Sequence, residues 1–206
     1  MASQGPNSPG TLVNDNSAGT VAWANPGNAA SSNDSWATAD NIGSGGFTTS
    51  QYLKVTNFGF SIPSGATING IVLEREGQCS VPGVRDHTIK LVVGGTISGN
   101  NKNSATFWSD TGDTIFTYGT STDLWGLTPS YSDINASNFG AVVRVVNTAF
   151  KFTSTASVDH VRITIYYTAG ASGPANVKTF NGLATTSIKT INGVAIASVK
   201  TINGLN

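Results

Sequence analysis

The sequence contains few charged residues, and the opposite charges balance. Only 11% of the 206 residues are Asp, Glu, Lys or Arg, and the formal net charge at pH 7 is zero, whereas about a quarter of an average globular chain is charged. No basic run or arginine-rich face is present, so the electrostatic requirement of nucleic-acid binding is not met. Surface polarity has to come from Ser, Thr and Asn, which suit exposed strands and turns.

Cysteine and histidine are also scarce, and this restricts the chemistry that the chain can carry. Cys79 is the only cysteine, so no intrachain disulfide can form and the usual zinc sites are excluded. His87 and His160 each follow an aspartate, but neighbours in a strand point to opposite faces and form no catalytic dyad. The G-x-S-x-G and H-E-x-x-H motifs are absent. We therefore expect no enzyme and no cofactor.

Long apolar runs are missing as well. No segment approaches the roughly 20 apolar residues that span a bilayer, so we expect no membrane partner. The N-terminus MASQGPNSPG has neither the basic nor the apolar region of a signal peptide. We expect a chain made in the cytosol, which would reach the outside of a cell only by lysis or through a signal that has been removed.

Short alternating segments separated by turn residues fill most of the chain, as in all-β proteins. The clearest predicted strands cover 68–76, 87–93, 139–146 and 158–167. The segment 139–146 is nearly all apolar, which predicts burial on both sides, and one helical turn is expected near Tyr131. About eight strands with long crossing loops favour an antiparallel β-sandwich of the jelly-roll type.

One predicted strand brings two acidic residues to the same face. In 68–76, Glu74 and Glu76 are expected on one side and Leu73 and Arg75 on the other, because side chains alternate along a strand. A carboxylate pair of this kind resembles the arrangement that glycosidases use. The pattern favours the simpler interpretation, which is a solvated strand face.

Aromatic residues in the loop-rich region 100–137 provide the candidate binding residues. Exposed aromatic rings with Asn and Asp side chains nearby can bind sugars. Trp108, Trp125 and Tyr131 are therefore candidate glycan contacts. The alternative is that the tryptophans fill the core between the two sheets. In the same region Asp110 and Asp113 could bind calcium in a loop, although they match no complete EF-hand pattern.

The last thirty residues repeat a unit of eleven. The copies read VKTFNGLATTS, IKTINGVAIAS and a truncated VKTINGLN. Asn-Gly between β-forming residues predicts a hairpin with a tight turn, and an isolated hairpin is marginal in water. We expect the tail to pack on another chain, with a homo-oligomer and in particular a trimer favoured; the alternative is a meander folded onto its own body. The apolar residues expected to mediate oligomerisation are Val177, Phe180, Leu183, Ile188, Ile191, Val194, Ile196, Val199, Ile202 and Leu205.

Composition divides the chain into four parts. Residues 1–18, rich in Gly, Pro, Ser and Asn, are predicted to form an extended N-terminal arm. The β-sandwich domain is expected at 19–170, followed by a Gly/Ser/Pro linker at 171–176. The repeat tail for oligomerisation or anchoring occupies 177–206.

Three stretches resemble a domain of phage and metagenomic virion proteins: YLKVTNFGFSIPSGATINGIVLERE, DLWGLTPSYSDINASNFGAVVRV and ASVDHVRITIYYT. The tail IKTINGVAIASVKTINGL is similar to the terminal repeats of such proteins. The resemblance covers residues 10–206 and includes no catalytic motif. It implies a non-enzymatic structural role in a virion, as head decoration or tail fibre, with other virion subunits as partners. Assembly in a reducing host cytoplasm agrees with the single cysteine.

Two other classes of function fit parts of the sequence. A carbohydrate-binding module would use the aromatic residues, and a host-surface glycan would then be its ligand. A subunit of an extracellular bacterial filament would use the repeat as a donor strand. Oligomeric mass separates these classes, because a trimer indicates a fibre or a capsid three-fold site and an open polymer indicates a filament.

Overall fold

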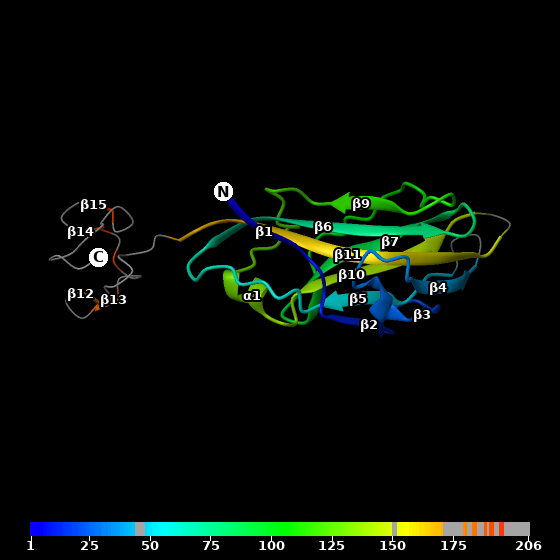
Figure 1. Ribbon diagram of the computed structural model, residues 1–206, viewed down its shortest axis with the longest axis horizontal. Coiled ribbons are helices and arrows are strands. Elements are labelled where there is room, and N and C mark those ends of the chain that lie inside the picture. Colours follow the sequence, from blue (N-terminus) through cyan, green and yellow to red (C-terminus); the bar gives the residue numbers. More distant parts are fainter. Residues whose placement is uncertain are drawn as a thin grey trace.

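The computed structural model describes residues 1–43, 48–149, 152–170 and 188, and the tail pieces 179–180, 183–184, 190–191 and 194–195. These residues form two antiparallel sheets that pack face to face, with one α-helix, α1 (Tyr131–Asn135), and one 3-10 helix, η1 (Pro26–Ala29) (Figure 1). The predicted all-β sandwich and the helical turn at Tyr131 are confirmed. Within the described residues, no helix has the length and apolarity needed to cross a membrane.

The first sheet, which we call sheet A, has six strands. Its order is β3-β4-β11-β6-β9, and β1 also pairs with β11. The strands are β1 (Ala2–Asn7), β3 (Trp23–Ala24), β4 (Ala37–Ile42), β6 (Thr67–Cys79), β9 (Thr114–Tyr118) and β11 (Ser154–Thr168). The two longest strands, β6 and β11, lie side by side in the middle of this sheet.

The second sheet, sheet B, has five strands in the order β2-β5-β10-β7-β8. The strands are β2 (Thr11–Asp15), β5 (Tyr52–Thr56), β7 (Val84–Val93), β8 (Thr96–Ser98) and β10 (Gly140–Asn147). Its central strand β10 is buried at all but one of its positions. The predicted burial of this segment on both sides is therefore confirmed.

The strands β4 to β11 pair in a nested order, in which the first strand pairs with the last, the second with the last but one, and so on. β4 pairs with β11, β5 with β10, β6 with β9, and β7 with β8, all antiparallel. Successive pairs fall alternately in sheets A and B, and the contacts of β6 with β11 and of β7 with β10 join them. This rolled ribbon is the jelly-roll topology that the sequence predicts.

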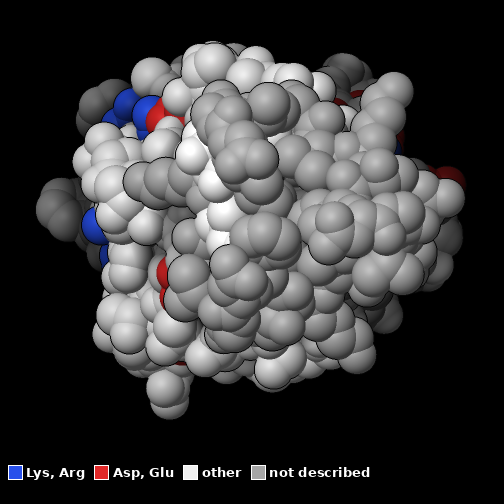
Figure 2. All heavy atoms as spheres, turned by 90° about the vertical axis from the view of Figure 1, so that its left-hand side faces the viewer, with Lys and Arg blue, Asp and Glu red and all other residues white. Residues whose placement is uncertain are grey.

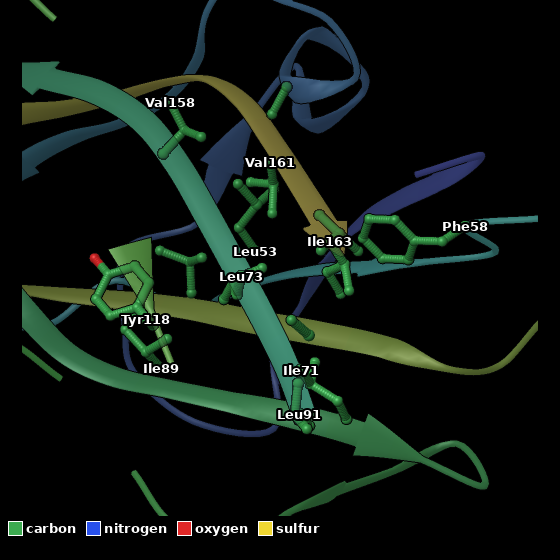
Figure 3. Packing of buried hydrophobic residues seen from close by; sticks show 14 of the residues in the cluster. Leu53, Phe58, Ile71, Leu73, Ile89, Leu91, Tyr118, Val158, Val161 and Ile163 are labelled. Carbon is green, nitrogen blue, oxygen red and sulfur yellow. The ribbon is translucent and has the colours of Figure 1, made fainter. Parts of the chain in front are cut away.

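Side-chain alternation places the core between the sheets. In β6, Ile71, Leu73 and Arg75 are fully buried, and the residues between them are half-buried. Figure 3 shows how side chains of sheet A, such as Leu73, meet Leu53 and Ile89 of sheet B. Burying such apolar side chains contributes about 1.5–3 kcal/mol each, so this layer is the main source of stability.

The N-terminal segment is part of the sandwich, which corrects the prediction of a separate arm at 1–18. β1 pairs with β11 and β2 pairs with β5, so this one segment contributes a strand to each sheet. The segment is extended, as predicted, but polar. Backbone hydrogen bonds to a sheet do not need apolar side chains. Composition alone therefore placed the start of the sandwich domain too late, at residue 19.

The tail contains two small hairpins. β12 (Thr179–Phe180) pairs with β13 (Leu183–Ala184), and β14 (Thr190–Ile191) pairs with β15 (Val194–Ala195). The register leaves two residues between the paired strands, at the position of the Asn-Gly dipeptide in each unit. The two antiparallel strands predicted for each of the first two repeat units are confirmed, and the Asn-Gly dipeptides between them lie outside the described residues. The linker 171–176 and the third unit, 199–206, lie outside the described residues.

Candidate functional site

The aromatic residues proposed as glycan contacts do not form a binding surface. Trp108 and Trp125 are 2% and 0% exposed. The Trp125 indole nitrogen donates to the Ile71 carbonyl at 2.9 Å, and that of Trp108 donates to an Asp86 carboxylate oxygen at 3.0 Å. Their role as glycan contacts is therefore wrong, and the alternative of core filling is correct. Tyr131 is half-buried at the start of α1.

A buried network of charged and aromatic side chains lies between the two sheets. The Arg75 guanidinium carbon is 3.7 Å from the Trp108 ring centroid and 4.5 Å from that of Phe116. The Tyr118 hydroxyl donates to Asp86 at 2.8 Å. Burial raises the pKa of Tyr118 far above its ordinary value, so the hydroxyl keeps its proton and remains a donor. Because the network is closed to solvent, its role is to join the sheets.

The two histidines lie in different sheets and do not contact each other among the described hydrogen bonds. His160 of β11 is opposite Glu76 in the strand register, and its Nε2 is 2.8 Å from the Ser8 hydroxyl. His87 of β7 is hydrogen-bonded to the Thr88 hydroxyl at 2.9 Å. Among the described residues, no carboxylate is hydrogen-bonded to either imidazole, so the Ser8–His160 pair lacks the third group that orients a catalytic histidine.

A shallow hollow lies on the outer face of sheet A. It is lined by Glu74, Glu76, Ile115, His160 and Arg162 and has a volume of about 150 Å³, open to solvent. Glu74 accepts two hydrogen bonds from Arg162, at 2.9 and 3.2 Å. Because this volume includes space that is open to solvent, the hollow is a surface depression and not an enclosed pocket.

The structure confirms that Glu74 and Glu76 share a strand face. The two carboxylates have different neighbours. Glu74 is neutralised by Arg162, whereas Glu76 has no ion-pair partner within the described part of the chain. Ile115, which is opposite Glu76 in the register of β6 and β9, is 50% exposed. An unpaired carboxylate beside an exposed apolar side chain is suited to a basic, partly apolar partner.

Three carboxylates from distant parts of the chain converge near the same strand. The oxygens of Asp34, Asp113 and Asp159 lie within 4.8 Å of one another. Asp159 is buried at a register shift of β11 and accepts from the Asn33 backbone N–H at 3.0 Å. Carboxylate oxygens are calcium ligands, and three of them supply part of the six to eight that calcium takes.

This cluster shows what sequence reasoning found and what it missed. Asp113 was singled out as a calcium ligand together with Asp110, but Asp110 is not part of the cluster. Asp34 and Asp159 were missed because they are far from Asp113 in the sequence. Asp159 lies at a register shift of β11, and Asp34 has a left-handed backbone with φ 58°.

Part of the predicted oligomerisation set lies in the described hairpins. Phe180 is paired with Leu183 and Ile191 with Val194, and Ile188 is half-buried. The remaining residues of the set, Val177, Ile196, Val199, Ile202 and Leu205, lie outside the described residues. Comparison of the chain with protein-family models, curated proteins and solved structures gave no significant match.

Proposed function

We propose that this protein is a non-enzymatic structural subunit of a virion, as capsid decoration or tail fibre, that assembles through its C-terminal repeats. The observation that supports the proposal is the pair of hairpins β12–β13 and β14–β15, in which each strand has only two residues. Hairpins this short are marginal alone. They gain stability by packing on further strands, so other copies of the chain, with a trimer favoured, are natural partners for the tail.

The sandwich supports a structural rather than an enzymatic role. Its interior is filled by apolar side chains and the closed Arg75–Asp86 network. The hollow on sheet A is shallow, and the described histidines lack catalytic partners. Only 11% of the residues are charged, and in Figure 2 most of the visible described atoms belong to uncharged residues. A surface with few charges suits close packing in an assembly, because few charged groups have to be desolvated.

Deletion of 177–206 tests the assembly part of the proposal. We expect the full chain to be a trimer and the deletion variant to be a monomer with an unchanged far-UV circular dichroism spectrum. The measurement is mass by light scattering after size exclusion. A chain in which residues 177–206 are scrambled, with the composition kept, is the matched control and should also be monomeric. A deletion variant that still oligomerises would overturn the proposal.

The virion part has its own test. Mass spectrometry of purified virus particles from cells that express the gene should find the protein in the particles, in a fixed ratio to the major capsid or tail proteins. An open polymer on the cell surface, without particles, would instead identify the bacterial filament that the sequence leaves as the alternative.

A further inference from the structure

Strand β9 leaves one side of its backbone open. In the part of the chain that the structure describes, it is the last strand of sheet A and pairs with β6 alone, from Gly77 opposite Thr114 to Leu73 opposite Tyr118. Among the described residues, no other group is hydrogen-bonded to the β9 backbone. Figure 1 shows β9 along the outer margin of the sandwich. A row of unpaired N–H and C=O groups is a template for one more strand.

The other sheet edges are protected in ways that β9 is not. β3 has two residues and β8 has three. β1 contains Pro6 and a register shift, and β2 packs against η1 and ends at Asp15, which is ion-paired with Lys54. Short length, proline, bulges and charge are the devices that block unwanted strand pairing. The sequence of β9, TIFTY, has none of them.

Charge also distinguishes the tail from the rest of the chain. Three of the eleven basic residues and none of the eleven acidic residues lie in 177–206, so 1–176 carries eight basic against eleven acidic residues, a net charge of −3. Some of this negative charge borders β9, since Glu76 lies on the adjacent strand and Asp113 directly precedes β9. The tail, whose lysines are Lys178, Lys189 and Lys200, is therefore electrostatically complementary to this edge.

We propose that the C-terminal repeat of a neighbouring copy pairs with β9 as an added strand and directs its lysine toward Glu76. Residues two apart share one face of a strand, so Lys189 and Ile191 would project together. Ile191 then packs against the exposed Ile115, and Lys189 extends over β9 toward the carboxylate of Glu76, which lies on the next strand, about 10 Å from the added one. The same spacing recurs in Lys178–Phe180 and Lys200–Ile202, so every repeat unit offers this pair.

The proposal rests on the proposed assembly function and makes it specific. Adding a strand to an open edge supplies backbone hydrogen bonds for affinity, and the alternate side chains supply specificity. Among the described residues, β6 is the only strand that pairs with β9, so the other side of β9 is open to a second copy of the chain.

Blocking the edge is the first test. The full-length variant with Ile115→Lys and Thr117→Lys places two charges on exposed positions of β9, and charges on an edge oppose pairing. Val13→Lys is the matched control, because Val13 is 44% exposed on the edge strand β2. We expect the β9 variant to lose the oligomer and the control to keep it, with both folded by circular dichroism. Equal masses for the two variants would overturn the proposal.

Charge exchange is the second test. Glu76→Lys in the full chain should weaken association about threefold for each contact, the size expected for a surface ion pair. The triple variant Lys178→Glu, Lys189→Glu, Lys200→Glu should weaken it similarly, and combining it with Glu76→Lys should restore association. A combined variant that is weaker than both parents would overturn the predicted pairing.

Hydrogen exchange locates the contact directly. In the full chain, the amides of Thr114–Tyr118 should exchange more slowly at concentrations where the oligomer forms than after dilution to monomer. Slow exchange that does not depend on concentration would mean that the chain's own tail covers β9, and this would overturn the proposal. If deletion of 177–206 abolishes assembly but the β9 changes do not, assembly through the tail stands and only the docking site is wrong.

Discussion

Arg75 of β6 and Asp86 of β7 face each other across the inside of the sandwich, and neither side chain reaches solvent. The distance from Nη2 to Oδ1 is 3.9 Å, and both side chains are 0% exposed. Asp86 also accepts from the Ser104 backbone N–H and the Trp108 indole, so its charge is well satisfied. Removing one member of such a pair leaves an uncompensated buried charge, whereas removing both members does not.

Asp86→Asn is therefore expected to lower the free energy of unfolding by about 3–5 kcal/mol, because it leaves the Arg75 guanidinium without its counter-ion. The same change should cost much less in a chain that already carries Arg75→Met. Denaturant unfolding of the two single variants and the double variant, at one protein concentration, measures the difference. Costs that simply add would show that the two residues are not coupled.

Trp125→Ala should destabilise the protein by about 3–5 kcal/mol, because a fully buried indole would be replaced by a cavity. The change also removes the hydrogen bond to the Ile71 carbonyl. Phe107→Ala is the matched control, since Phe107 is 55% exposed and surface changes usually stay within about 0.5 kcal/mol. Thermal unfolding is the measurement, and similar midpoints for both variants would contradict the placement of Trp125 in the core.

Asp113→Asn should raise the thermal midpoint by about 1–3 °C in buffer containing EDTA. The change removes one of three carboxylates whose oxygens lie within 4.8 Å of one another and so relieves like-charge repulsion. Asp110→Asn removes the same charge from the same loop outside the cluster and should leave the midpoint unchanged. If the two variants behave alike, the effect comes from net charge and not from the cluster.

Replacing His160 should reduce the pH dependence of stability. Burial, with the nearby Arg162, lowers the pKa of His160 below its ordinary value of 6.5. The unfolded chain then binds this proton more readily than the folded protein, so the stability is fully present above about pH 6.5 and decreases as the pH falls. His160→Gln should make the unfolding free energy fall less between about pH 7 and pH 5, while His87, whose pKa burial also lowers, still contributes to the fall. A variant that still follows the wild-type curve would contradict this.

Local pattern was enough to predict most of the fold. Strand positions, the buried β10 and the two faces of β6 follow from period-two alternation, which every strand obeys whatever it packs against. The hairpins at 179–184 and 190–195 follow from Asn-Gly, whose preference for positive φ is a property of the dipeptide itself. Pattern also put Arg75 on the same face as Leu73, and the structure buries both.

Patterns of composition were less reliable guides. The segment 1–18 was predicted to be an arm because it is polar, yet backbone pairing holds it in both sheets. Trp108 and Trp125 sit in a loop-rich region, and sequence could not choose between an exposed rim and the core. That choice depends on partners such as Asp86 and Ile71, which belong to other strands.

The sequence by itself determined an all-β chain with a jelly-roll body and a hairpin repeat, because alternation and turn chemistry act over a few neighbouring residues. Only the tertiary structure decided that Asp34, Asp113 and Asp159 meet, that Glu76 lacks a basic partner within the described residues, and that β9 ends its sheet with one open side. Each of these depends on strand order and register, which bring together residues that lie far apart in the chain.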